Sequence, residues 1–206
     1  MELHEALGQI SEIRAQMART QTFGGFRSLT VASSGFLGIL AAIYQANRIP
    51  RPMEQIEDYV ALWSAVAALS LLAVGVELVY SYSVAMSTLR RRLTTHAIRQ
   101  FVPCLVAGAA LTAVIIARAP ETAWMLPGMW SLLFGLGVFA SSRLLPRPIV
   151  WVGAYYLFTG SACLAFGKSE FQLSSWMMAA TFGFGQLLAA LILYCTLERG
   201  DEEIEA

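Results

Sequence analysis

The stretch VALWSAVAALSLLAVGVELVYSYSV, residues 60–84, carries a single charged residue, Glu77. A helix needs about 20 mainly apolar residues to cross roughly 30 Å of hydrocarbon at about 1.5 Å per residue. Sufficient length is what distinguishes a membrane span from a buried helix of a soluble protein. Residues 60–84 are therefore predicted to form a transmembrane helix.

The chain as a whole is also rich in apolar residues and poor in charged ones. Of its 206 residues, 57% are hydrophobic and 14% are charged, and the mean hydropathy is +0.59. A soluble domain carries about 25% charged residues. The predicted fold is an all-α membrane protein whose six spans, joined by short turns, form three antiparallel hairpins within residues 26–198. The predicted spans are residues 29–46, 60–84, 101–117, 123–141, 149–167 and 175–197.

The distribution of Lys and Arg predicts the orientation. Basic residues resist translocation, so the segments that are rich in them stay in the cytoplasm. Ten of the fourteen basic residues fall in the N-terminal segment, the second and fourth loops and the tail. This bias predicts that both termini are cytoplasmic. An even number of spans also requires the termini to share one side, so the two inferences agree.

The N-terminal segment, residues 1–25, is predicted to be a cytoplasmic amphipathic helix. Its apolar residues recur every three or four positions, with glutamates early and arginines late, which matches the helix dipole. Two roles stay open: docking on the bundle's own cytoplasmic face, or binding a partner protein. The apolar stripe contains Leu3, Leu7, Ile10, Ile13 and Met17. The chain closes with an acidic segment, residues 199–206.

The second loop, residues 87–100, is strongly basic. Basic residues beside a cytoplasmic leaflet gain about 1 kcal/mol each from anionic lipid, so electrostatic anchoring is the favoured role. A specific lipid or nucleotide site is the alternative. The residues concerned are Arg90, Arg91, Arg92 and Arg99.

Glu77 is the one acidic residue inside a predicted span. A charge near a helix centre costs about 2.5–3.5 kcal/mol, so such residues usually face a cavity or a partner. One interpretation is a carboxylate that binds a proton or cation in a polar cavity formed by the second, fourth and sixth spans. The other is a structural Glu that pairs with Arg143, Arg147 or Gln186, or that reaches toward the inner headgroups.

Gln186 lies in the sixth span behind Gly183 and Gly185. Glycine lets two helices approach closely, so Gln186 is predicted to hydrogen-bond across such a contact. Trp130, deep in the fourth span, is predicted to pack between helices. Prolines and glycines also make kinks possible in the third and fourth spans. The residues in question are Pro103, Pro127, Gly128, Gly135 and Gly137.

The motifs of common enzyme classes are missing from the sequence. It contains no HExxH, GxSxG or Walker motif, and His4 and His96 both lie outside the spans. The cysteines, Cys104, Cys163 and Cys195, are odd in number and lack CxxC spacing, which argues against a disulfide framework or a zinc site. We therefore expect no catalytic residues, cofactor or metal. The zero net charge gives no overall field to attract nucleic acid.

Three runs carry a resemblance: FVPCLVAG at residues 101–108, WMLPG at residues 124–128 and LLPRP at residues 144–148. With them the chain resembles six-helix integral membrane proteins of bacteria, a group with no assigned activity. The resemblance extends over nearly the whole chain. It implies a bacterial inner membrane and a single membrane domain, and it implies no substrate.

Two classes of function follow from these features. The first is a non-enzymatic inner-membrane protein that acts through a partner protein, in sensing or assembly, with the N-terminal helix as its contact. The second is a small transporter or permeation protein that uses Glu77.

Overall fold

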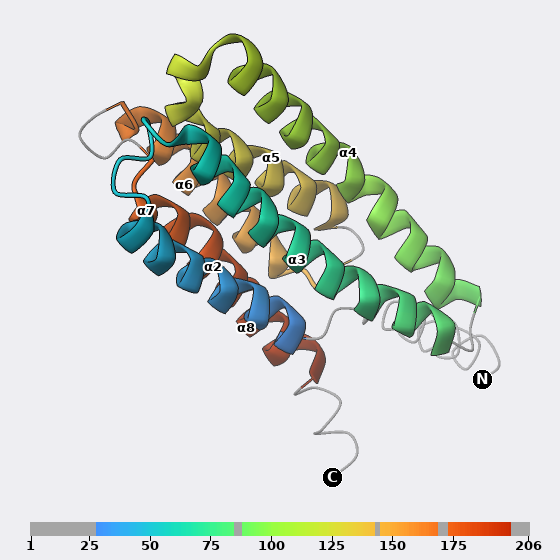
Figure 1. The fold of residues 1–206 in the computed structure, drawn as a ribbon. Coiled ribbons are helices and arrows are strands. Elements are labelled where there is room, and N and C mark those ends of the chain that lie inside the picture. Colours follow the sequence, from blue (N-terminus) through green and yellow to red (C-terminus); the bar gives the residue numbers. More distant parts are fainter. Residues whose placement is uncertain (1–27, 85–87, 143–144, 169–172, 199–206) are drawn as a thin grey trace, which may run out of the picture.

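The structure, a computed structural model, describes residues 28–84, 88–142, 145–168 and 173–198. The described chain is helical and contains no strand (Figure 1). Six segments are long and apolar enough to cross a membrane, which confirms a multi-pass all-α membrane fold. They are Ser28–Arg48, Ile56–Tyr80, Arg99–Arg118, Pro120–Ser141, Ile149–Phe166 and Ser175–Thr196. The predicted amphipathic helix, the acidic tail and Arg143 lie outside the described residues.

The first two spans are α2, Ser28–Arg48, and α3, Ile56–Val84. α3 begins four residues earlier than the predicted span. The extension places Glu57 and Asp58 in the first turn, where the helix dipole favours acidic side chains.

The predicted basic loop is largely helix. α4, Thr88–Arg118, contains Arg90, Arg91 and Arg92 near its start, and Arg99 begins its membrane-spanning part. Neither Gly nor Pro occurs from its start to Pro103, and adding residues to an existing helix is far easier than starting one. The helix therefore extends back through the basic residues, and it continues past Pro103.

The fourth span combines a 3₁₀ turn, η1, Pro120–Met125, with α5, Leu126–Ser141. Pro127 lies in the first turn of α5, where its missing N–H removes no helix hydrogen bond. Pro127 is therefore compatible with the start of α5 at Leu126, and a kink in the fourth span stays a prediction. The fifth span is α6, Ile149–Phe166.

The sixth span changes its winding along its length. It runs through α7, Ser175–Met178, a π-helical segment η3, Ala179–Phe184, then α8, Gly185–Leu193, and a second π-helical segment η4, Tyr194–Glu198. π-helical turns loosen the regular backbone ladder and are frequent near functional sites. Inside η3, the hydroxyl of Tyr155 on α6 donates a hydrogen bond to the carbonyl of Ala180.

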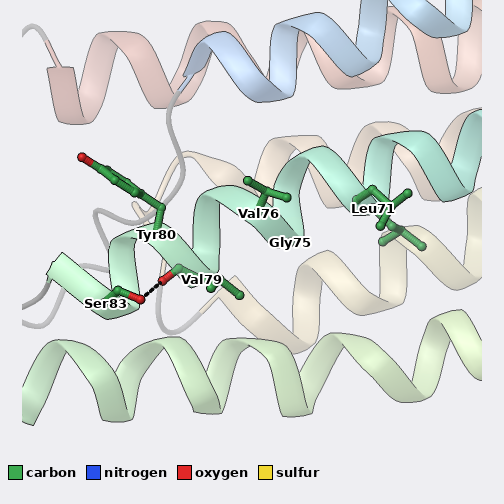
Figure 2. A pocket seen from close by; sticks show the side chains of 7 residues that line it. Leu71, Gly75, Val76, Val79, Tyr80 and Ser83 are labelled. Atoms are coloured by element: carbon green, nitrogen blue, oxygen red, sulfur yellow. Dashed lines mark hydrogen bonds between the residues drawn. The ribbon is translucent and has the colours of Figure 1, made fainter.

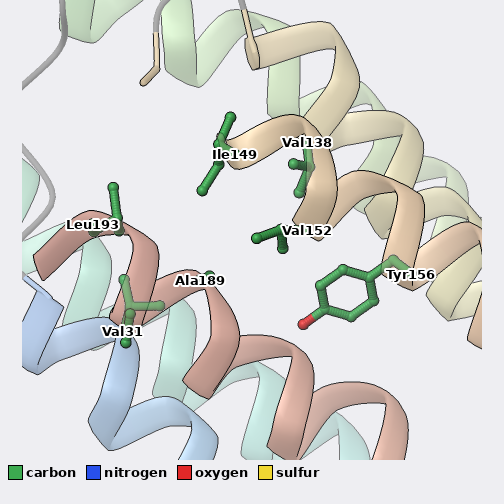
Figure 3. Close-up of a cluster of buried hydrophobic side chains, with 8 residues drawn as sticks. Val31, Val138, Ile149, Val152, Tyr156, Ala189 and Leu193 are labelled. Carbon is green, nitrogen blue, oxygen red and sulfur yellow. The ribbon is translucent and has the colours of Figure 1, made fainter. Parts of the chain in front are cut away.

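Four spans form the core, and two lie against it. A buried apolar cluster joins α2, α5, α6 and α8, and Figure 3 shows its side chains converging between these helices. In the spans of these helices 33–44% of residues are buried, against 11% in the α3 span and 6% in the α4 span. The cluster comprises Val31, Val138, Ile149, Val152, Tyr156, Ala189, Ala190 and Leu193.

Glycines set the closest helix contacts. A Cβ on Gly128 would lie 2.8 Å from the carbonyl oxygen of Gly160, and one on Gly135 would lie 3.2 Å from that of Gly153. The glycines recur every seven residues on both α5 and α6, so both contacts fall on one face of each helix. Gly128 and Gly135 therefore serve packing between helices, a role that small residues fill in membrane helices.

Candidate functional site

α3 turns one side toward the bundle from Tyr59 to Glu77. Tyr59 and Trp63 are buried, and Val66, Ser70 and Glu77 are half-buried at intervals that return to the same helix face. Beyond Trp63, no described residue of α3 is fully buried. α3 is therefore held tightly near its start and loosely in its second half, where Glu77 lies on the bundle side.

A buried polar network holds the start of α3. The indole N–H of Trp63 donates a hydrogen bond of 2.9 Å to the side-chain oxygen of Gln45 on α2. The amide nitrogen of Gln45 donates one of 2.7 Å to the carbonyl of Leu173, just before α7. Gln45 is only 2% exposed. One amide side chain thus ties α2, α3 and the start of the sixth span together.

Aromatic packing also holds the start of α3 in place. The ring of Tyr59 stacks parallel to that of Trp130 on α5, with centroids 6.4 Å apart. The indole N–H of Trp130 donates a hydrogen bond of 2.8 Å to the hydroxyl of Thr112 on α4. The prediction that Trp130 packs between helices is confirmed, and its contacts link α3, α4 and α5.

Glu77 lies away from the buried contacts of Gln45, Trp63 and Trp130 that hold the start of α3. The residue is half-buried and takes part in a polar interaction within the protein. Arg143, its predicted partner, lies outside the described residues. Whether Glu77 is a structural pair or a functional carboxylate therefore stays a prediction.

A shallow apolar groove, open to the surroundings and lined by residues of this one helix, lies on α3 (Figure 2). Its volume is about 550 Å³. Glu77 does not line it: at 3.6 residues per turn, Glu77 is rotated by roughly 160° from both Gly75 and Val79. α3 thus has an apolar groove on one side and Glu77 on another. The lining residues are Leu71, Leu72, Gly75, Val76, Val79, Tyr80 and Ser83.

The close contact expected near Gln186 exists between α2 and the sixth span. A Cβ on Gly35 would lie 3.0 Å from the carbonyl oxygen of Gly183, and one on Gly38 would lie 3.5 Å from its nitrogen. Gln186 is half-buried one turn further along. The predicted close approach is confirmed, and the hydrogen bond from Gln186 stays a prediction.

The buried polar groups that the sequence reasoning missed include the amide of Gln45 and the hydroxyl of Tyr156. The sequence does mark the first of them, because Gln45 is an amide at the end of an otherwise apolar span. The second is the hydroxyl of Tyr156, which is fully buried against Gly185 and finds no hydrogen-bond partner among the described residues. Nothing in the sequence marks that hydroxyl, since its isolation results from helix packing.

The described residues contain no group of three side chains able to hold a metal ion, and all three cysteines are free thiols. No protein-family profile, curated protein or solved structure matches this chain. The function is therefore inferred from the sequence and from the geometry of the described residues.

Proposed function

We propose that this protein is a non-enzymatic component of a bacterial inner membrane that acts through a partner protein, in sensing or assembly. The N-terminal amphipathic helix is its contact, and both termini lie in the cytoplasm.

The packing of the four central spans supports this proposal. Their helices meet closely at glycines: a Cβ on Gly128 would lie 2.8 Å from the carbonyl oxygen of Gly160, and one on Gly35 would lie 3.0 Å from that of Gly183. A buried hydroxyl links two of these helices: Ser131 on α5 donates a hydrogen bond of 2.8 Å to the carbonyl of Tyr156 on α6. A transport path needs polar groups lining a water-accessible route. The groove on α3 is apolar and lies outside the core.

Co-purification tests the partner proposal. In a detergent extract of native membranes, Ile10→Lys interrupts the apolar stripe of the N-terminal helix, while Gln9→Lys adds the same charge beside it. We expect Ile10→Lys to lose a stoichiometric partner that the wild type and Gln9→Lys retain. Equal recovery of the partner with both variants contradicts the contact, and absence of any partner from wild-type preparations contradicts the function.

A transporter that uses Glu77 is the second candidate. Its support is the position of Glu77 on the bundle side of α3, in the half of the helix without fully buried residues. Glu77→Gln removes the charge with little change in shape. Glu57→Gln, on the exposed first turn of the same helix, is the matched control. Loss of proton or cation flux in proteoliposomes with Glu77→Gln alone supports transport; equal flux in all three proteins excludes this role.

A further inference from the structure

The sixth span takes part in two distinct buried apolar clusters. Its start joins α2 and α3 in one of them, which we call the Trp63 cluster. Its second half, α8, joins α2, α5 and α6 in the cluster shown in Figure 3, which we call the Tyr156 cluster. η3 leads from one to the other, and Phe182 within it packs against both. The boundary between two packed units of the bundle therefore falls in η3. The Trp63 cluster comprises Ala41, Ala42, Tyr59, Trp63, Leu173, Met178 and Ala179.

The unusual winding of η3 is supported by Tyr155 on α6. π-helical winding is rare, and an uncommon backbone arrangement persists only where its surroundings support it. The hydroxyl of Tyr155 donates a hydrogen bond to the carbonyl of Ala180, inside η3. Side chains of neighbouring helices often satisfy backbone groups in this way where a membrane helix departs from regular winding. Tyr155 is half-buried and Ala180 is exposed, so this bond lies at the edge of the bundle and can open without repacking either cluster.

The adjacent tyrosine acts through its ring instead. Tyr156 is fully buried in the cluster named after it, and its hydroxyl, which lies against Gly185, finds no hydrogen-bond partner among the described residues. Tyr156 therefore holds α6 against the sixth span by packing, whereas Tyr155 does so by a hydrogen bond. Replacing each tyrosine by phenylalanine separates these two contributions.

We propose that η3 is a hinge between the Trp63 cluster and the Tyr156 cluster, and that the hydroxyl of Tyr155 is the latch that holds this hinge in place. When the latch opens, the start of the sixth span moves with the Trp63 cluster, and hence with α3, relative to α5, α6 and α8. Gly183 inside η3 and Gly185 directly after it are small residues of the kind that hinges often contain. One hydrogen bond shifts a two-state equilibrium roughly two- to twelvefold. The hinge does not depend on the proposed partner.

Hydrogen–deuterium exchange of the full-length protein, read by mass spectrometry, tests the latch. In the wild type we expect the amides of residues 179–185 to exchange faster than those of residues 186–193, after correction for intrinsic rates. Tyr155→Phe should accelerate exchange in residues 179–185 by roughly two- to twelvefold, since it removes one hydrogen bond. Tyr156→Phe is the matched control and should exchange as the wild type does. Residues 128–135 of α5 are the internal reference and should exchange equally in all three proteins.

Distances between paired spin labels test the movement. The native cysteines are first replaced by alanine, and labels are then attached at exposed positions. Trp176→Cys with Leu191→Cys places one label on each side of η3, whereas Trp151→Cys with Leu191→Cys places both labels on the side of the Tyr156 cluster. We expect a broader distance distribution for the first pair than for the second already in the wild type. Tyr155→Phe should broaden or displace the first distribution and leave the second unchanged.

Several results would overturn the proposal. Equal protection of residues 179–185 and 186–193 in the wild type would exclude a hinge, and so would equally narrow distributions for the two label pairs. These two measurements decide the matter even if Tyr155→Phe does not fold. Unchanged exchange in Tyr155→Phe, or the same acceleration in Tyr156→Phe, would exclude the latch. Acceleration that extends to residues 128–135 would make Tyr155 a support of the whole fold, and faster exchange without a change in distances would reduce the effect to local fraying.

Discussion

The indole N–H of Trp63 on α3 donates a hydrogen bond of 2.9 Å to the side-chain oxygen of Gln45 on α2. The same amide donates a hydrogen bond to the carbonyl of Leu173, the one described non-glycine residue with a positive φ, 53°. Both ends of the amide are thus engaged in a site that excludes solvent. This pair fixes the position of α3 and supports an unfavourable backbone conformation before the sixth span.

Replacing Gln45 should destabilise the protein strongly. Gln45→Leu keeps the approximate volume but leaves the Trp63 N–H and the Leu173 carbonyl without partners. Each unsatisfied buried group costs about 1–3 kcal/mol. We expect a clear fall in the midpoint of thermal unfolding in detergent. Asn47→Leu, which removes an exposed amide one half-turn away, is the control and should change the midpoint little.

Two glycines should respond in opposite ways to alanine. A Cβ on Gly128 would lie 2.6 Å from Leu164 Cγ and 2.8 Å from the Gly160 carbonyl oxygen, whereas one on Gly75 meets open space. Gly128→Ala should cost about 1–3 kcal/mol through overpacking. Gly75→Ala should be neutral or stabilising by up to about 1 kcal/mol, since alanine favours helix. Equal unfolding midpoints for the two variants would contradict the packing of α5 against α6.

Removing the Tyr156 hydroxyl should not harm stability. This group is buried without a hydrogen-bond partner among the described residues, so Tyr156→Phe keeps the ring contacts and deletes an unsatisfied polar atom. We expect the free energy of unfolding to stay constant or rise. Ser131→Ala is the contrasting variant, because Ser131 bonds to the Tyr156 carbonyl, and it should lower stability by about 1 kcal/mol. Loss of stability with Tyr156→Phe would indicate a partner such as a buried water.

Labelling of single cysteines tests the orientation. Cys104, Cys163 and Cys195 are first replaced by alanine, and cysteine is then introduced at Met53, Glu121 or Lys168. The distribution of arginine predicts that all three positions face away from the cytoplasm. We expect a membrane-impermeant maleimide to label each of them in intact cells. Labelling only after the cells are opened would reverse the predicted orientation.

The six spans could be predicted because the requirement for crossing a bilayer is local. Each span needs enough consecutive apolar residues, and that number can be counted along the chain without knowing its neighbours. The orientation could be predicted in the same way, because the basic residues in each loop can also be counted along the chain. The starts of α3 and α4 were predicted less accurately. Polar residues such as Glu57 and Arg90 are good helix formers, so the helix extends beyond the apolar segment.

The apolar runs of the sequence are enough to predict an all-α protein of six membrane-spanning helices, and Glu77 stands out as the acidic residue inside those runs. The packing of Gly128 against Gly160, the hydrogen bond between Gln45 and Trp63, and the placement of Gly75 and Glu77 on different faces of α3 became visible in the folded structure alone. The physical reason is that a membrane helix is apolar on every side, so hydrophobicity does not mark the face that meets another helix. That face is selected by the fit of small residues and by hydrogen bonds between helices, which exist only after the helices have packed.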